Sequence, residues 1–523
     1  MSSEDQLQVL VLDIYSQIKG TPLELELFKQ AQIISQNPLL RSSELKQTVI
    51  ETLSKKEHGT QLKNTVYKYL QKRPAVPHPK AGPEHLKEPL TYIRKAQSNW
   101  DKRIVKSLNS MCTELGVPLA RKRSEKDQKE VIVHWGELGT AAPDLSAFRP
   151  VYAPKDFLEV LVGLRNPNAH SGEPSSFSSL WGIIQVPLRI RSIMELRLRF
   201  NEMSINQCQT GVDDNPDIPP ELFDNDRSKL AKKVLNNKHS PLSQEFLKKG
   251  APPGVRAELW KQTLGVDVDQ IDQLYYEQLK SYVVQHDLLV DSLIYKDVKL
   301  TATNDDQYFV FEDYIYQVLF PFSRDTQVLD HFKHSSANPP KSYIRGKLGV
   351  EEFAVHYPPN GVIPFHGFAM YVAPLCYIYD DPVVLYYVFR ELYMRYFFRL
   401  HQISSHPQSI VSLCLLFESL LQSQEPQLFL HLKTIQAQPL RIAFKWLIRA
   451  FSGYLDSEQV LLLWDRVLAY NSLEILAVLA VAIFSFRKTN LLQVGTASAA
   501  EGVLADITTL KVVPLIQLSL FST

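Results

Sequence analysis

Helical spacing of apolar residues dominates the second half of this chain. From Leu242 to Phe486 one segment after another places its large apolar side chains three or four residues apart, and no alternation of strands with helices interrupts them. Val383 to Leu400 is apolar around most of a helix circumference and predicts a central helix, and Ile475 to Phe486 predicts a hydrophobic helix at the density of a core. Such helices are buried on all sides, so this half predicts an all-α domain with one large core.

The first half predicts smaller helical pieces. A proline-rich segment that runs to Pro89 is expected to be an extended connector. A long amphipathic helix should run from Leu86 to Leu115, and its apolar stripe faces either another part of this chain or a coiled-coil neighbour. Because 523 residues exceed what one core usually supports, we expect several structural regions. They are N-terminal amphipathic helices in 1–73; the connector, the long helix and a mixed helix and loop region in 74–220; the main helical domain in 240–490; and a helical tail packed on that domain in 491–523.

Charge and cysteine content argue against several classes of function. With 57 Lys and Arg against 56 Asp and Glu, the net charge of +1 gives no global attraction for nucleic acid or for an anionic membrane. Four widely separated cysteines without a C-x-x-C pair argue against a zinc site and predict reduced thiols. The polar, acidic first ten residues do not resemble a signal peptide, and the longest apolar run is shorter than the roughly 20 residues of a membrane helix. We therefore expect a cytoplasmic chain with peripheral membrane association at most.

A basic stretch precedes the main domain. A helix is expected over Val186 to Phe200, where the sequence changes between helical and strand spacing. Its arginines could meet an acidic partner or lipid headgroups, although a solvated face is the more common outcome. They are Arg189, Arg191, Arg197 and Arg199.

Motifs for several catalytic chemistries are absent. The chain has no GxxxxGK[ST], GxGxxG, HExxH or GxSxG sequence, so nothing supports nucleotide hydrolysis in a site of its own, dinucleotide chemistry or zincin proteolysis. His331 and His334 lie three residues apart, but no third ligand stands at a supporting spacing, and a solvent-exposed pair is expected. We expect neither a metal nor a cofactor of the chain's own.

Three segments carry a more specific pattern. The first is a turn rich in glycine and proline, which ends a loop and begins a helix. The second holds an aromatic-rich loop, and the third pairs two tryptophans across neighbouring helices. They are Lys249-Gly250-Ala251-Pro252-Pro253 followed by Arg256, Trp260 and Gly265; Phe365-His366-Gly367-Phe368-Ala369-Met370 within Gly361 to Pro374; and Pro439 to Phe451 with Trp446, followed by Leu463-Trp464-Asp465-Arg466.

In this order and spacing, the three segments resemble the TBC domain, the all-helical module of GTPase-activating proteins for Rab small GTPases. They are similar to its "GIP" turn with R-x-x-x-W, its "GYCQGM" segment and its closing "W…lF…lWDrl" pattern. The resemblance, which spans roughly Leu242 to Phe486, implies a role in membrane traffic and a Rab partner that carries the GTP and Mg. Within it, the residues expected to support the structure are Gly250, Pro252, Arg256, Trp260, Trp446, Trp464 and Asp465.

The family acts in trans, by placing an arginine and a glutamine in the nucleotide site of the bound GTPase. Phosphoryl transfer spreads negative charge over the transferred group and needs an oriented water, so both side chains answer a physical need. The arginine closes an I-x-x-D-x-x-R motif, and the matching run Ile294 to Leu300 places Leu300 there. The glutamine belongs to Y-x-Q, and the matching Pro364-Phe365-His366 places His366 there.

Neither replacement has the chemistry of the family residue. Leucine carries no charge, and histidine lacks the paired donor and acceptor of an amide. Lys299 is charged but lacks the planar fork of arginine. Either Lys299, Arg324 or Arg345 substitutes for the missing finger, or Leu300 and His366 only line a groove, so the catalytic residues stay open. Contacts with the GTPase are expected at Asp297, Phe365, His366 and Gly367.

Two functions follow from the resemblance. In the first, the chain is a GTPase-activating protein, or a GAP-like regulator, for a Rab, without itself being a hydrolase. In the second, a catalytically silent TBC domain binds a Rab or another partner as an adaptor in membrane traffic. A helical scaffold without any GTPase contact is a third alternative.

Overall fold

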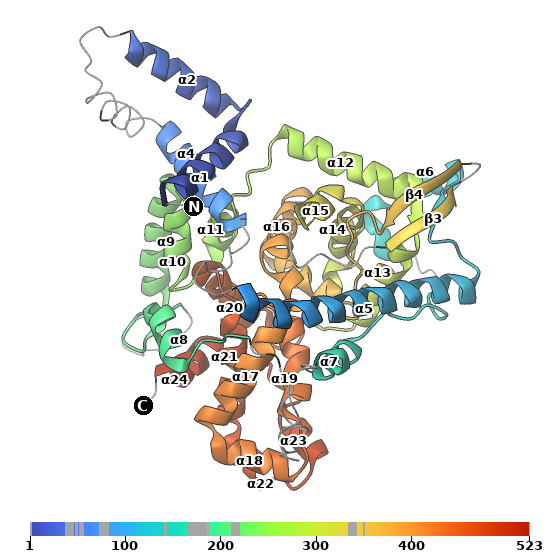
Figure 1. The fold of residues 1–523 in the computed structure, drawn as a ribbon, viewed down its shortest axis with the longest axis vertical. Helices are drawn as coiled ribbons and strands as arrows, with labels where there is room; N and C mark the ends of the chain where they lie inside the picture. The colour runs from blue at the N-terminus through green and yellow to red at the C-terminus, as the bar shows by residue number, and fades with distance from the viewer. Residues whose placement is uncertain are drawn as a thin grey trace. The chain divides into compact units, whose positions relative to one another are not determined.

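The structure is a computed structural model that describes residues 3–36, 47, 51, 57–72, 83–140, 144–164, 186, 188–210, 220–332, 342–348 and 351–521. Helices dominate the described part, which confirms the predicted all-α class (Figure 1). The chain separates into two compact units, each considered by itself below. The first comprises Met1–Val76, Asp217–Leu247 and Ala251–Asp267, and the second comprises Pro77–Pro216, Lys248–Gly250 and Val268–Thr523.

The first unit joins N-terminal helices to helices from the middle of the chain. Helix α4 packs against α1, α2 and α10, while α9, α10 and α11 pack on one another. A pair of side chains on α4 fixes this arrangement: Asn64 Nδ2 donates to Lys238 O at 2.7 Å, and Tyr67 Oη donates to Gln244 Oε1 at 2.6 Å. The helices are α1 (Ser3–Ile18), α2 (Pro22–Ser35), α4 (Glu57–Lys72), α9 (Pro220–Asn236), α10 (Ser240–Leu247) and α11 (Pro253–Leu264).

Helix α11 starts at the glycine- and proline-rich turn. Pro253 occupies the first helical position, where its missing N–H is no loss. The guanidinium of Arg256 folds back and donates to Ala251 O at 3.0 Å, which fixes the start of the helix. Trp260 is fully buried, and Gly265 ends the helix in the left-handed conformation at φ 64°.

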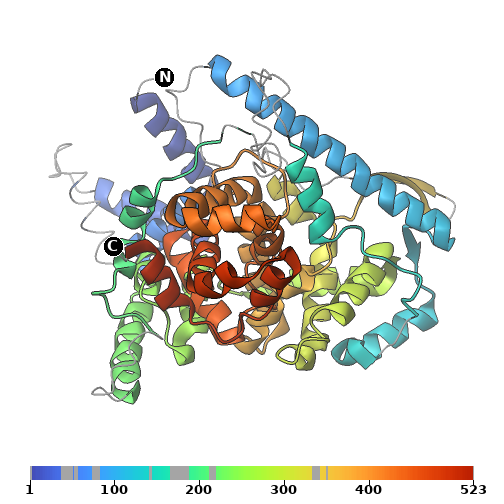
Figure 2. The same ribbon diagram turned by 90° about the horizontal axis from the view of Figure 1, so that it is seen from below.

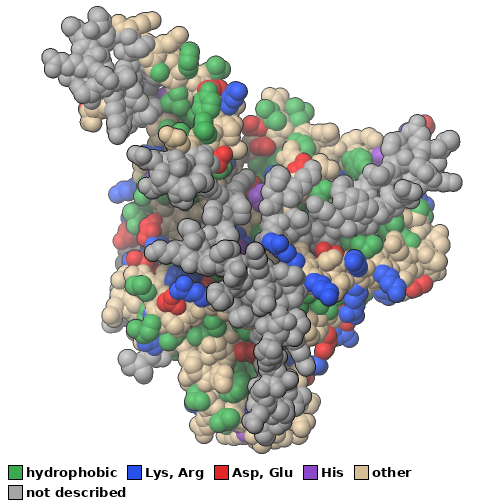
Figure 3. Space-filling model, viewed as in Figure 1, with side chains coloured by type: hydrophobic (Ala, Val, Ile, Leu, Met, Phe, Trp, Pro, Cys, Tyr) green, Lys and Arg blue, Asp and Glu red, His purple; other side chains and the backbone are tan. Residues whose placement is uncertain are grey.

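The long helix α5 (Pro83–Leu115) belongs to the second unit. The buried stripe contacts this chain: the Trp100 ring lies 5.1 Å from Tyr152 and 5.3 Å from Phe157 in α7 (Pro154–Val162). The expectation of an extended connector up to Pro89 was wrong, because the helix already begins at Pro83, a residue suited to a first helical position; residues 73–82 lie outside the described part. Lys and Arg side chains gather over α5 (Figure 3), and its exposed cations are Arg94, Lys95, Lys102, Arg103 and Lys106.

The largest part of the second unit is a helical core. The hydrophobic helix α21 (Glu474–Phe486) is buried from Glu474 to Phe484 and packs against α17, α19 and α24, so the hydrophobic helix expected over Ile475 to Phe486 is present. In Figure 2 these helices form the orange and red group. The other α-helices after residue 268 in this unit are α12 (Gln270–Gln285), α13 (Leu289–Leu300), α14 (Glu312–Arg324), α15 (Thr326–Phe332), α16 (Pro382–Arg395), α17 (Ile410–Gln424), α18 (Pro426–Thr434), α19 (Pro439–Ile448), α20 (Ser457–Tyr470), α22 (Lys488–Gln493), α23 (Ala497–Val503) and α24 (Val512–Phe521).

Short antiparallel strand pairs also occur in the second unit. Strand β1 (Ala120–Lys122) pairs with β2 (His286–Leu288), just before α13. Strands β3 (Ser342–Leu348) and β4 (Glu351–Tyr357) pair with each other. Helix α6 (Glu125–Val133) and the 3₁₀ turn η1 (Trp135–Thr140) follow β1, and η1 packs on α14.

The basic stretch differs from the prediction. Helix α8 (Ile193–Arg199) starts seven residues later than expected, because Ser192 caps it by accepting from Glu195 N. Arg191 pairs with Glu474, and Arg199 donates to Tyr470 O at 2.8 Å, the last carbonyl of α20. The solvated arginine face was therefore wrong for these two residues, which bind a carboxylate and a helix C-terminus inside the unit.

Other features bear on membrane and metal binding. None of the described helices is both long and apolar enough to cross a membrane. Within the same residues, no three His, Cys, Asp or Glu side chains come together as metal ligands could. All four cysteines are free thiols. His334, half of the predicted histidine pair, lies outside the described residues.

Candidate functional site

A buried carboxylate joins the end of α13 to the loop at residues 365–369. Asp297 is 5% exposed and accepts hydrogen bonds from Gly367 N at 2.5 Å and Ala369 N at 2.7 Å. Burial raises the pKa of this carboxyl to about 6, and the backbone donors act in the opposite direction. Gly367 has φ +108°, a left-handed conformation that favours glycine. This link fixes the loop beside α13.

Leu300 lies one turn beyond Asp297, at the last position of α13. Leu300 is 43% exposed. It contributes neither charge nor a hydrogen-bond donor. The position where the resemblance expects an arginine is therefore open to solvent and uncharged.

Two cations considered as substitutes for that arginine already have acidic partners. Lys299 Nζ lies 2.5 Å from Glu312 Oε1 and donates to Gly139 O at 3.3 Å, so a carboxylate already neutralises its charge. Arg324 was a wrong alternative: its side chain is fully buried, paired with Asp291. The side chain of Arg345, in β3, is not among those that the structure describes, so this alternative stays a prediction.

His366 is held by its backbone and leaves its ring partly exposed. Its N–H donates to Tyr152 O at 3.0 Å, while 31% of the side chain is accessible. Nδ1 lies 3.7 Å from Asp297 Oδ1. Burial, and then the positive charge of Arg449, lower the pKa of His366 below its usual value. The ring is therefore neutral at pH 7 and offers one donor and one acceptor.

Three residues far upstream support this site. Phe365, which is 1% exposed, packs on the Tyr152 ring at 5.9 Å, while Tyr152 O binds His366 as described. Lys296 Nζ donates to Leu145 O at 2.7 Å, and Gly139 O binds Lys299. Sequence reasoning missed these contacts, because nothing in the loops around Gly139, Leu145 and Tyr152 indicates which distant residues they meet.

Arg449 is a second residue of this site that the sequence analysis did not identify. It follows α19 and donates through Nη2 to His366 O at 3.1 Å. Its guanidinium lies so close to Gly367 that a Cβ there would come within 2.1 Å of Nε. The only sequence signal was its place three residues after Trp446, in a segment otherwise interpreted as structural.

The residues expected to be structural lie inside the fold. Gly250 has φ +89°, and a Cβ there would meet the Arg466 guanidinium at 2.8 Å. Trp446 and Trp464 are buried, and Trp464 Nε1 donates to Ala450 O at 3.0 Å. Asp465 is fully buried with its carboxylate 3.9 Å from Arg466 Nη1, and Pro252 precedes α11 directly.

Comparison with known proteins identifies the family. A family model of the Rab-GTPase-TBC domain matches residues 365–492. TBC1 domain family member 19 of Homo sapiens is 59% identical over 523 residues, which cover 100% of this chain and 99% of that protein. Two solved structures are more distant: the Chlamydomonas flagellar RabGAP TBC domain (TM-score 0.41, 16% identity, 58% of this chain and 92% of that one) and the Ypt/Rab-GAP domain of Gyp1p (TM-score 0.39, 12% identity, 63% and 97%). From the family match and the human relative, the chain belongs to the RabGAP-TBC family.

Proposed function

We propose that the chain binds a Rab small GTPase through the surface around Leu300 and His366, and regulates it as a GAP-like protein whose two finger positions supply no conventional catalysis. One observation carries this proposal. The arginine position is held by an exposed, uncharged leucine, while the adjacent Lys299 is neutralised by Glu312.

The absence of an arginine at position 300 has a large effect on the activation barrier for GTP hydrolysis. An arginine finger contributes about 10³–10⁵ in rate, roughly 4–7 kcal/mol of barrier. A leucine contributes none of this. A neutral histidine offers a single donor for orienting water, which replaces at best part of what an amide does. Binding without acceleration is thus the function that the geometry supports best.

A weak GTPase activator is the second candidate. It is supported by the partly exposed ring of His366 and by the guanidinium of Arg449 beside it. In either case the partner would carry the GTP and Mg, and this chain would need no cofactor of its own. We further propose that it works in the cytoplasm and reaches organelle membranes through the bound GTPase.

A panel of purified Rabs tests the proposal with the full-length chain. Affinity for the GTP-loaded and GDP-loaded forms is measured beside phosphate release at saturating protein. We expect at least one Rab to bind preferentially in its GTP form and to hydrolyse GTP at its intrinsic rate. Acceleration by the wild-type chain would support the weak activator instead, and the absence of binding in either state would leave only the scaffold.

A matched pair of variants locates the surface. Leu300→Glu places a charge at the proposed contact and should weaken binding at least about 10-fold, because a buried unpaired charge opposes association. Leu430→Glu changes another exposed leucine, 60% accessible on α18, and should leave affinity unchanged. Equal effects of both variants would place the contact elsewhere.

A further inference from the structure

Two cations at the end of α19 have no carboxylate within ion-pair distance among the described residues, although the charge of Arg449 also acts on the buried Asp297. Lys445 and Arg449 stand four positions apart and flank the same ring, with Lys445 Nζ 5.7 Å and Arg449 Cζ 5.6 Å from the centroid of Tyr454. Both side chains are partly exposed. Arg441 at the other end of the helix is paired, 2.7 Å from Glu159 Oε1. The unpaired charge is therefore confined to the end nearest the 365–369 loop.

Attraction to the helix C-terminus explains only part of this arrangement. A cation there gains roughly 0.3–1 kcal/mol from the helix dipole, wherever its side chain points. Arg449 instead turns onto the loop, where Nη2 binds His366 O and the guanidinium covers Gly367. Its buried Nε finds no hydrogen-bond partner among the described residues.

Hydrogen-bonding capacity remains on this guanidinium. Arginine has five N–H donors in a planar fork, and within the described part His366 O accepts one hydrogen bond from it. A phosphate, with several charged oxygens, suits such a fork, and a neighbouring ammonium group adds a point charge. Lys299 cannot do the same, since Glu312 holds it.

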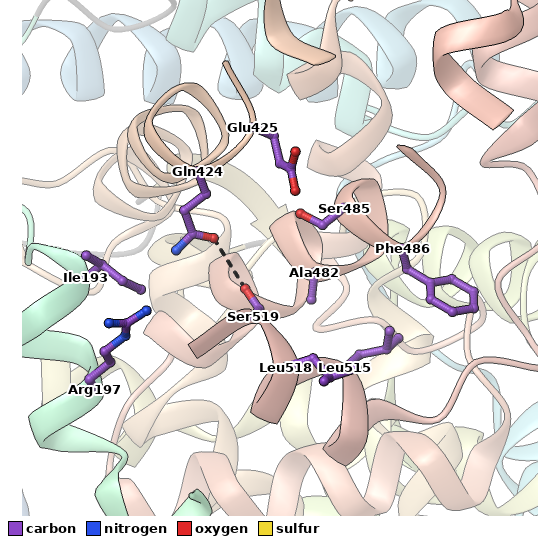
Figure 4. A pocket seen from close by; sticks show the side chains of 10 residues that line it. All are labelled: Ile193, Arg197, Gln424, Glu425, Ala482, Ser485, Phe486, Leu515, Leu518 and Ser519. Atoms are coloured by element: carbon purple, nitrogen blue, oxygen red, sulfur yellow. Dashed lines mark hydrogen bonds between the residues drawn. The ribbon is translucent and has the colours of Figure 1, made fainter. Parts of the chain in front are cut away.

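A cavity elsewhere in the second unit makes a contrast. A cavity of about 440 Å³ lies among α8, α17, α21 and α24 (Figure 4). Its charged residues already have partners: Arg197 donates to Leu520 O, and Glu425 lies 2.8 Å from Lys488 Nζ. Gln424 and Ser519 also bond to each other across it. At the end of α19, by contrast, two cations stand together around one ring.

We propose that Arg449, with Lys445 beside it, forms an anion site that receives the terminal phosphate of the GTP carried by the bound GTPase. This inference rests on the proposed function and deepens it. The site takes over, from a different helix, the charge that Leu300 cannot supply. Because GDP lacks the terminal phosphate, the site makes binding selective for the GTP-bound state, even when hydrolysis is not accelerated.

Three substitutions at one position separate charge from support of the loop. Arg449→Gln keeps a donor for His366 O and removes the charge, Arg449→Lys keeps the charge without the fork, and Arg449→Ala removes both. Lys445→Ala tests the second cation, and Arg441→Ala is the control on the same helix. Thermal melting of each full-length variant checks that it folds.

Affinity is measured for a wild-type-binding Rab loaded with GDP or with a non-hydrolysable GTP analogue. A charge-assisted hydrogen bond corresponds to about 10-fold or more in affinity. Arg449→Gln and Arg449→Ala should therefore weaken the GTP-state complex at least about 10-fold and the GDP-state complex less than about 2-fold. Lys445→Ala should have a smaller effect of the same kind, Arg449→Lys should be intermediate, and Arg441→Ala should match wild type.

Other results overturn the inference in distinguishable ways. If Arg449→Gln retains full preference for the GTP state, or loses both states equally, Arg449 only supports the loop and the anion site is refuted while Rab binding stands. If Arg449→Gln instead abolishes binding to phosphoinositide vesicles and leaves both Rab complexes unchanged, the anion is a lipid headgroup. If the wild-type chain binds no Rab in either state, the proposed function fails and the inference falls with it.

Discussion

Restoring an arginine at position 300 should convert the bound state into an activating one. Leu300 is 43% exposed at the end of α13, so a longer side chain has room, and the lost packing of a half-buried leucine costs only about 1 kcal/mol. The nearest charge on the same helix, Lys299, is neutralised by Glu312 and does not strongly repel a new guanidinium. Leu300→Arg should therefore fold and present its charge outward.

The expected gain follows from what the site still lacks. A complete arginine finger gives about 10³–10⁵ in rate. Without an amide to orient the water, we expect Leu300→Arg to reach only about 10²-fold, or about 2.7 kcal/mol of barrier. Adding His366→Gln should bring the double variant to about 10³-fold or more, because the loop that carries His366 is already fixed by Asp297 through Gly367 N.

Single-turnover phosphate release from a GTP-loaded Rab, at saturating full-length protein, measures this gain. Leu430→Arg is the control, since it adds the same charge at an exposed leucine on α18. Affinity is recorded in parallel. If Leu300→Arg binds as tightly as wild type and hydrolysis stays at the intrinsic rate, the position does not face the nucleotide and the reasoning is refuted.

Three further predictions concern the fold around the site. Burial lowers the pKa of His401 to about 3. Below about pH 6.5 the unfolded chain therefore binds a proton at this histidine that the folded chain does not bind. The free energy of unfolding should fall as pH decreases from about 6.5 towards 3, by up to about 1.4 kcal/mol per pH unit for this group. Urea unfolding from pH 4 to 7 should show a shallower slope for His401→Gln, and an unchanged slope would exclude this histidine as a cause. Gly367→Ala should destabilise by about 1–3 kcal/mol in thermal melting, because φ is +108° and the new Cβ would collide with a guanidinium. Gly495→Ala, which has open space around it, should be nearly neutral, and equal shifts would contradict the argument. Arg324→Ala leaves the buried Asp291 with Arg123, 3.6 Å away, as its remaining cationic partner, so the free energy of unfolding should fall by about 3 kcal/mol, the lower end of the range for breaking a buried pair. A loss below about 1 kcal/mol would mean that the pair is solvated.

The spacing of apolar residues predicted the helices whose buried faces depend on neighbours in the sequence. The apolar stripe of α5 and the all-round apolar helix α21 follow from side chains that recur every three or four residues. The start of α5 was misplaced, because proline is tolerated in the first helical turn and the proline cluster hid the helix signal. The pairing of β1 with β2, between segments about 160 residues apart in the chain, carries no periodic signal in strands of three residues.

The site was predicted only as far as its motifs extended. The family pattern located Leu300 and His366, and the structure brings the loop of His366 to the helix of Leu300 through Asp297. Arg449 and Tyr152 were not found, because each meets His366 through a backbone atom, and such contacts leave no requirement on the type of residue at position 366. The sequence also could not predict that Glu312 neutralises Lys299, because this ion pair depends on where α14 places Glu312.

The support that Gly139, Leu145 and Tyr152 give to the site has two consequences. All three lie upstream of the segment that resembles the family module, yet their carbonyls bind Lys299, Lys296 and the backbone of His366. A recombinant fragment that begins at Leu242 would lose these three hydrogen bonds, so a negative result obtained with it would describe the fragment rather than the protein. The same contacts mean that substitutions near residues 140 or 150 can shift the positions of Lys296, Lys299 and His366 without any change in the sequence of the module.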